Sequence, residues 1–212
     1  MNTSTAVRTK LALARPALQV ASAPLWRTSG LRQRFPAYLR TLHAVIRASV
    51  PLMRMAARRS EELGAKELHA YLIEHIDEER DHDVWLLEDL AVLDEGPVDV
   101  PPPAVARMVG AQYYWIAHHH PVALMGYIAV LEGNAPAGWF ADWVIAATGL
   151  PEAAVRTVRL HADLDRAHID EVYDLLDRLD LSPAQQAFVT VSGLSTMDSL
   201  IELFGAIAVR EG

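Results

Sequence analysis

The sequence predicts an all-α protein, a bundle of about seven helices. Proline, glycine and helix-capping residues recur at spacings that delimit long segments, whereas the signals that delimit short alternating strands do not recur. In a chain of 212 residues, a hydrophobic fraction of 51% and a charged fraction of 22% are typical of a folded globular protein and exclude a disordered one. We therefore expect one compact helical core.

Each predicted helix is delimited by residues that begin or break helices. Pro36 opens the first core helix and Gly64 follows its end, with Pro51 between them as a kink or a break. Ser182 and Pro183 form the N-cap and first-turn pair of the last helix. The seven predicted helices cover residues 36–63, 66–93, 104–119, 121–132, 136–149, 151–179 and 183–209.

Charge is distributed very unevenly along the chain. Residues 1–59 contain 11 Lys and Arg and no acid, whereas residues 60–212 contain 8 basic and 27 acidic residues. We expect a basic, disordered tail over residues 1–30 and a single helical metal-binding domain over residues 31–212. The start is similar in composition to a mitochondrial transit peptide, but its basic residues continue to Arg59, inside a predicted helix. These basic residues either pair with acidic helices or attract an anionic substrate or carrier.

The composition disfavours two classes of partner. The net charge is −8 and no nucleic-acid-binding motif is recognisable, so nucleic-acid binding is not expected. The best candidate for a membrane span, residues 121–131, is too short to cross a bilayer. We therefore predict a soluble, cytoplasmic protein without a membrane partner.

Two segments repeat the pattern His-x3-acid-x2-His, namely His75, Glu79 and His82, and then His161, Asp165 and His168. On a helix, positions i, i+4 and i+7 fall within roughly 60° of one another, so each set would form one stripe of imidazole and carboxylate. One such stripe is commonly part of a solvated face. Both stripes lie beside apolar positions, however, and two facing stripes would make a metal site. Because the chain has no cysteine, its strong ligands are His, Asp and Glu, which suit iron or manganese.

A further carboxylate, Glu132, ends an apolar segment. It is the only acid between Asp99 and Asp142. A carboxylate in such surroundings pairs with an arginine, is neutralised by a proton or binds a metal. It would complete a set of six ligands, enough for two irons with open positions for dioxygen: Glu79, His82, Glu132, His161, Asp165 and His168.

The order of these motifs resembles the heme-oxygenase-like diiron oxidases, which are also described as iron-containing redox enzymes. The resemblance covers about residues 36–180 and rests on HIDEERDHDVWLLEDL at 75–90, YYW at 113–115, PVALMGY at 121–127, VLEG at 130–133 and the second histidine pattern. It implies a seven-helix heme-oxygenase-like bundle with two iron ions that react with dioxygen. Family members oxidise amines or amino acids at nitrogen, desaturate, or cleave carbon–carbon bonds in amino acids and fatty acids, often in natural-product biosynthesis.

The resemblance assigns all six of these residues as metal ligands. It makes Glu79 and Glu132 the catalytic carboxylates, which shift between terminal and bridging positions. Many members carry another carboxylate on the first core helix, but this chain has no acid before Glu61. His75, Glu78 or His43 would have to compensate for it, or the second iron would be weakly held.

Other functions stay open on the same sequence. A haem-degrading enzyme would leave the repeated acid-bearing pattern unused, and a thiaminase-like hydrolase would usually need a cysteine nucleophile. A mononuclear or non-catalytic iron-binding module would need no cavity beside its metal. For an enzyme we expect a small-molecule substrate, a redox partner and a homodimer. Arg40, Arg47 and Arg54 on the first core helix would then bind a carboxylate-bearing or carrier-bound substrate.

Overall fold

The computed structural model describes residues 2–208, apart from the side chains of residues 163 and 165–167. Within that part, the chain forms ten α-helices and two short 3-10 turns and has no strand, so the predicted all-α class is confirmed. Two predicted helices are each divided in two, and one helix is added at the N-terminus. The predicted break near Pro51 separates α2 (Leu31–Ile46) from α3 (Ser49–Glu62), and Pro51 lies in the first turn of α3, where no N–H is needed.

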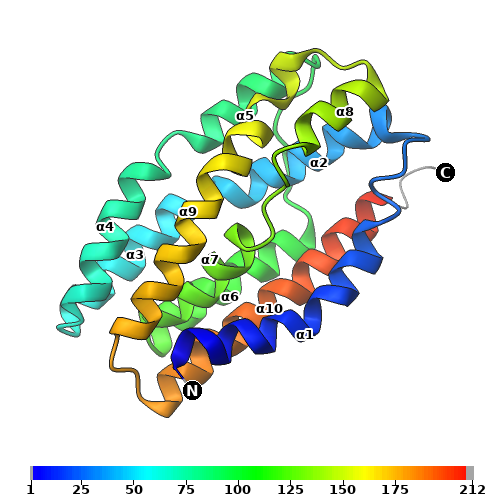
Figure 1. Ribbon diagram of the computed structural model, residues 1–212. Coiled ribbons are helices and arrows are strands. Elements are labelled where there is room, and N and C mark those ends of the chain that lie inside the picture. The colour runs from blue at the N-terminus through cyan, green and yellow to red at the C-terminus, as the bar shows by residue number, and fades with distance from the viewer. Residues whose placement is uncertain (1, 209–212) are drawn as a thin grey trace.

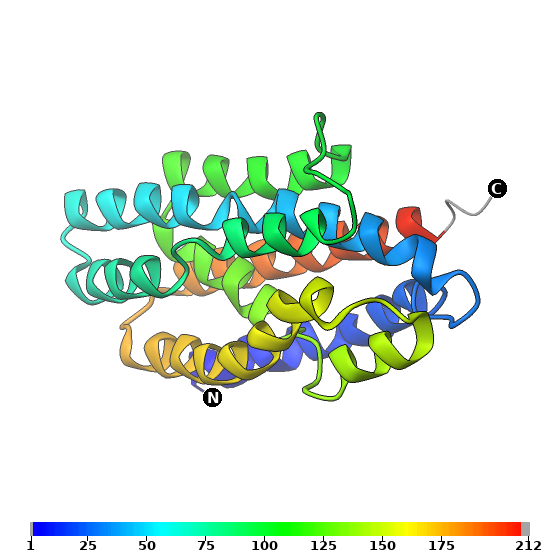
Figure 2. The same cartoon turned by 90° about the horizontal axis from the view of Figure 1, so that it is seen from above.

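The helices form a layered bundle (Figures 1 and 2). Helices α2 and α3 follow each other in one direction, and α4 (Lys66–Glu78) and α5 (His82–Ala91) run back alongside them. Helix α3 thus packs against α4, and α2 packs against α5. The remaining elements are α6 (Pro103–His118), η1 (Pro121–Ala123), α7 (Leu124–Glu132), α8 (Phe140–Thr148), η2 (Glu152–Val155), α9 (Arg156–Arg178) and α10 (Pro183–Ala208). The short helix α7 packs against both α9 and α10 in the interior.

The expectation of a disordered N-terminal tail is wrong for most of its length. Residues Thr3–Ser22 form helix α1, which lies along α10 (Figure 1) and buries Val7, Leu11 and Leu18. These residues are four and seven positions apart and make one apolar stripe, which a long partner helix can cover. Asp177 of α9 holds the start of α1, because its carboxylate accepts hydrogen bonds from the Ser4 backbone and hydroxyl at 2.8 and 2.7 Å.

A close crossing of α7 and α10 sets the position of Glu132. A Cβ atom at Gly126 would lie 2.0 Å from the carbonyl oxygen of Val189 and 2.7 Å from the backbone nitrogen of Gly193. The two backbones therefore approach so closely that residue 126 has to be glycine. This contact fixes α7 with its last residue, Glu132, buried in the centre of the bundle.

The second predicted helix is interrupted where no proline or glycine marks a break. Helix α4 ends at Glu78, Asp81 adopts a left-handed conformation with φ 68°, and α5 begins at His82. Aspartate is one of the few residues other than glycine that tolerate this conformation. The first His-x3-Glu-x2-His pattern therefore lies across a helix break, and the prediction that it forms one stripe on one helix is wrong.

Helix α10 is long and apolar enough to span a membrane by length and composition alone. Half of its most apolar window is buried inside the bundle, and it contacts α1, α6 and α7. Such burial is compatible with a helix of the protein core. The cytoplasmic location stays a prediction.

Candidate metal centre

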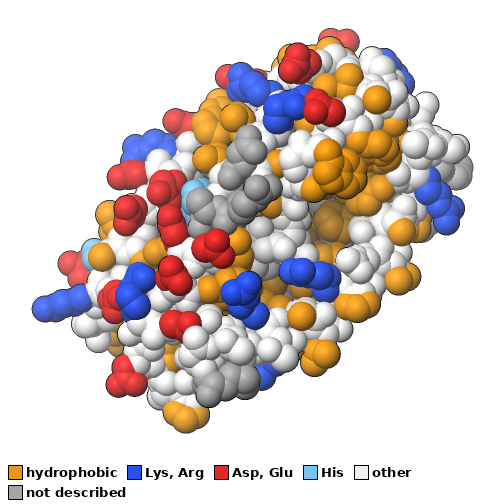
Figure 3. Space-filling model, viewed as in Figure 1, with side chains coloured by type: hydrophobic (Ala, Val, Ile, Leu, Met, Phe, Trp, Pro, Cys, Tyr) orange, Lys and Arg blue, Asp and Glu red, His pale blue; other side chains and the backbone are white. Residues whose placement is uncertain are grey.

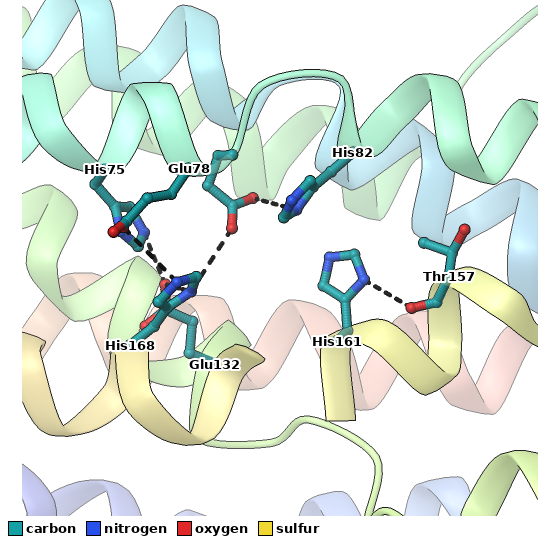
Figure 4. A network of polar contacts seen from close by, with 8 residues as sticks. His75, Glu78, His82, Glu132, Thr157, His161 and His168 are labelled. Carbon is teal, nitrogen blue, oxygen red and sulfur yellow. Dashed lines mark hydrogen bonds and ion pairs between the residues drawn. The ribbon is translucent and has the colours of Figure 1, made fainter. Parts of the chain in front are cut away.

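Two groups of three potential metal ligands lie next to each other in the core (Figure 4). We call the first the Glu132 cluster, which consists of His75, Glu132 and His168. We call the second the His161 cluster, which consists of Glu79, His82 and His161. Within each cluster, one potential ligand atom from each residue lies within 4.8 Å of the other two. The long helix α9 contributes one histidine to each cluster, two turns apart.

The Glu132 cluster is built around an ion pair. The Nε2 atom of His75 lies 2.8 Å from Oε1 of Glu132, and Nδ1 of His168 lies 4.0 Å from the same oxygen. Glu78 borders the cluster on its more exposed side, with its Oε2 atom 3.2 Å from Nδ1 of His75 and 3.7 Å from Nε2 of His168. The ring of Tyr71 stacks on His75 at a centroid distance of 5.3 Å. This cluster therefore has charge and packing that hold its ligands in place.

The His161 cluster offers an imidazole nitrogen that nothing in the described protein occupies. Nδ1 of His161 donates to the backbone carbonyl of Thr157 at 2.9 Å, which leaves the lone pair on Nε2. That Nε2 atom is buried and has no hydrogen-bond partner. The rings of His161 and His82 form a T-shaped pair with a centroid distance of 4.8 Å. A histidine that donates one N–H to a carbonyl and presents the other nitrogen is arranged as metal-binding histidines usually are.

Glu79 lies between the two clusters and faces both. Its Oε2 atom is 3.3 Å from Nδ1 of His82, and its Oε1 atom is 3.8 Å from Nδ1 of His168. The helix break at Asp81 makes this possible, because Glu79 caps the end of α4 while His82 begins α5. A carboxylate with one oxygen toward each cluster could bridge two metal ions.

Burial and mutual charge change the pKa values in opposite directions across the centre. Burial lowers the pKa of His75, but its hydrogen bond with Glu132 and the charges of the nearby glutamates outweigh burial and raise the pKa to about 9. Burial also raises the pKa of Glu132, more than the neighbouring histidines lower it. Burial lowers the pKa of His161, so this imidazole is neutral at neutral pH and can donate its lone pair to a metal.

Burial raises the pKa of Glu79, but the hydrogen bond and charge of His82, together with the charges of other histidines, lower it by more. Glu79 is thus ionised, as a bridging ligand must be. One oxygen of Glu132 and Nδ1 of His168 are also buried without a hydrogen-bond partner. Such atoms are costly in a core unless something binds them. The described residues therefore fit the hard-to-borderline metal ions that the composition suggests.

The structure brings most of the predicted site residues together. Five predicted ligands lie in the two clusters: Glu79, His82, Glu132, His161 and His168. His75, predicted as a substitute for the missing carboxylate of the first core helix, lies there too. Glu78 borders the Glu132 cluster, and the side chain of Asp165 lies outside the described residues. His43, the alternative on the first core helix, is buried on α2 and belongs to neither cluster. No sequence motif marks the Thr157 carbonyl as a partner of His161.

A cavity of about 130 Å³ adjoins both clusters. His75, Glu79, Glu132 and His161 line one part of it, and most of its remaining wall is apolar, with side chains such as Leu42, Val45, Met53, Ile128 and Leu203. Among the described side chains, neither Lys nor Arg lines it. Of the predicted carboxylate-binding arginines, Arg40 instead pairs with Glu95 at 3.2 Å, and Arg47 and Arg54 are exposed away from the cavity.

The sequence matches no protein-family model and no curated protein. Solved structures, however, match almost the whole chain. A domain of unknown function with a heme oxygenase-like fold from Shewanella denitrificans superposes with a TM-score of 0.80 at 16% identity, over 96% of this chain and 90% of that one. The protein has a heme oxygenase-like fold. The fold that the sequence resemblance implied is thereby confirmed.

Two further structures share this heme oxygenase-like architecture. A TenA homolog from Pseudomonas syringae matches with a TM-score of 0.72 at 15% identity, over 96% of this chain and 92% of that one. A CADD-like protein of unknown function from Nostoc punctiforme matches with a TM-score of 0.68 at 12% identity, over 95% and 98%. Likeness at such low identity establishes the fold and not the activity.

Proposed function

We propose that the protein is a non-haem di-iron oxygenase or oxidase. It would use dioxygen to oxidise a small amine, amino acid or fatty-acid-like substrate by N-oxygenation, desaturation or C–C cleavage, with natural-product biosynthesis as the expected setting. The observation that carries the proposal is the pair of buried ligand clusters, which Glu79 of the His161 cluster links and which border an apolar cavity. Bound as Fe(II), two ions would supply electrons to reduce dioxygen.

Each cluster would hold one iron. His75, Glu132 and His168 would bind one ion, with Glu78 within reach of the same histidines. Glu79, His82 and His161 would bind the other, and the sequence spacing adds Asp165 to the set. His75 thus compensates for the carboxylate that the first core helix lacks.

The protein's own groups have three tasks in this function. The Thr157 carbonyl keeps His161 in the tautomer that can bind a metal. Glu79 and Glu132 are the catalytic carboxylates, which neutralise charge and can change their mode of binding. The apolar cavity excludes water and holds the substrate beside the reacting centre, where the buried hydroxyl of Tyr127, which has no hydrogen-bond partner, is free to orient it.

Anaerobic iron loading followed by exposure to dioxygen tests the proposal. We expect the wild-type protein to bind two equivalents of Fe(II), and to consume dioxygen with a transient visible absorption band. Glu132→Ala and His161→Ala should each lose one equivalent and the absorption change, whereas His118→Ala, which removes an exposed histidine of α6, should lose neither. Binding of one equivalent or none, without dioxygen consumption, would favour a mononuclear or non-catalytic module.

A further inference from the structure

Three hollows of the molecule meet at one segment, residues 133–136. The apolar cavity is the first. The second, which we call the arginine cleft, measures about 430 Å³ and lies between α1 and α9, with Arg8, Arg15, Tyr173, Ile169 and Glu132 among its walls. The third is lined by α1 and the aromatic side chains of α8. Asn134, Ala135 and Pro136 line all three, so the two surface clefts and the cavity adjoin one another at this segment.

The arginine cleft has two cations without acidic partners. Arg8 lies over the ring of Tyr173 at 4.7 Å, and one nitrogen of Arg15 donates to the Gly133 carbonyl at 3.4 Å. In the described part of the chain, neither arginine lies within ion-pair distance of a carboxylate. The only acid that lines the cleft there is Glu132, whose Oε1 atom is already held by His75. Figure 3 shows basic side chains over α1 beside a hollow with an apolar wall.

We propose that Arg8 and Arg15 bind the carboxylate of an amphipathic substrate, whose apolar part passes residues 133–136 into the cavity beside the metal centre. The role as substrate rests on the proposed function, whereas the binding site itself does not. The cavity accepts an apolar chain, and no Lys or Arg with a described side chain lines it to neutralise a carboxylate. The adjoining cleft supplies two guanidinium groups, which recognise carboxylates well. This site replaces Arg40, Arg47 and Arg54, none of which lines either hollow.

Calorimetric titration of the metal-free protein with octanoate and 1-octanol tests the proposal. The wild-type protein should bind octanoate at least about tenfold more tightly than octanol. Arg8→Gln and Arg15→Gln should each weaken octanoate binding by about tenfold and leave octanol binding unchanged. Arg54→Gln, which removes an exposed arginine of α3 outside all three hollows, should change neither affinity.

A variant that keeps both charges separates recognition from packing. Arg8→Lys/Arg15→Lys should retain most of the octanoate affinity that the double glutamine variant loses. Three results would each overturn the proposal. The first is equal octanoate affinity in the double glutamine variant and the wild type, and the second is a wild type without preference for octanoate over octanol. The third is a loss of octanoate affinity in the lysine variant as large as that in the double glutamine variant. Because no metal is present, failure of iron loading would leave these results valid, and an active di-iron protein without octanoate preference would overturn this inference alone.

Discussion

The Glu132 cluster contains the shorter of the two histidine–carboxylate ion pairs within the clusters, whereas in the His161 cluster the Nε2 atom of His161 is buried without a partner. His75 and Glu132 form an ion pair at 2.8 Å, and the pKa of His75 is raised to about 9. Nε2 of His161 has no hydrogen-bond partner, and burial lowers the pKa of this histidine. A metal entering the first cluster must displace a proton and break an ion pair, whereas the second cluster presents a free lone pair.

The difference teaches that two similar sets of ligands need not bind metal equally well. Each cluster contains two histidines, one glutamate and one ion pair, but the His75–Glu132 pair is shorter, at 2.8 Å, than the His82–Glu79 pair, at 3.3 Å. The cost of leaving the ligands of the Glu132 cluster without metal is therefore lower, and so is the gain of that cluster from binding one. We expect the His161 cluster to fill first, with Glu79 linking the two.

The largest expected effect comes from changing Glu79, the residue that faces both clusters. Glu79→Gln keeps the size of the side chain but removes the charge that faces both His82 and His168. We expect both iron affinities to fall, by at least about hundredfold at the His161 cluster, and dioxygen consumption to be lost. Metal analysis after anaerobic loading and an oxygen electrode measure both. Glu74→Gln, on the exposed face of α4, is the matched control, and an unchanged iron content in Glu79→Gln would remove Glu79 from the bridge.

Single-cluster variants should separate the two affinities. His161→Ala removes the unpaired nitrogen and should abolish the tighter binding event, a loss of about hundredfold in affinity. His75→Ala should change the affinity of the tighter binding event by no more than a few-fold and should remove the weaker event. Anaerobic titration with Fe(II) under competition from a chelator resolves the two steps. The reverse result, with His75→Ala removing the tighter event, would invert the proposed order of filling.

The metal-free protein should lose stability as the pH rises above neutrality. The pKa of His75 in the folded protein is about 9, above its ordinary value of 6.5, so its stabilisation is complete below pH 6.5 and disappears as the pH rises through 9. The loss should amount to a few kcal/mol at most. Urea unfolding at pH 6.5 and pH 9 measures it. His75→Gln should remove this slope and His118→Gln should keep it; an equal slope in both variants would assign it to other groups.

The sequence was informative where proline and glycine mark boundaries, as at Pro103 and Pro183, which open α6 and α10. It predicted which histidines and glutamates gather, because the repeated spacing and the isolated Glu132 are local features. It missed helix α1, whose stabilising partners, α10 and Asp177, lie more than 150 residues away in the chain. It also missed the division of the ligands into two clusters. That division depends on the helix break at Asp81, which no glycine or proline marks in the sequence.

The smallest expected effect tests that break directly. Asp81 has a φ of 68°, which glycine adopts without steric cost and which a β-branched residue strongly disfavours. Asp81→Gly should therefore raise the free energy of unfolding by up to about 1 kcal/mol and keep two equivalents of iron. Asp81→Val should lower stability by about 1–2 kcal/mol and weaken iron binding at the His161 cluster, because His82 begins the helix that follows. If Asp81→Val instead binds iron as the wild type does, the break is not what holds His82 beside His161, and packing of α5 on α9 must do so.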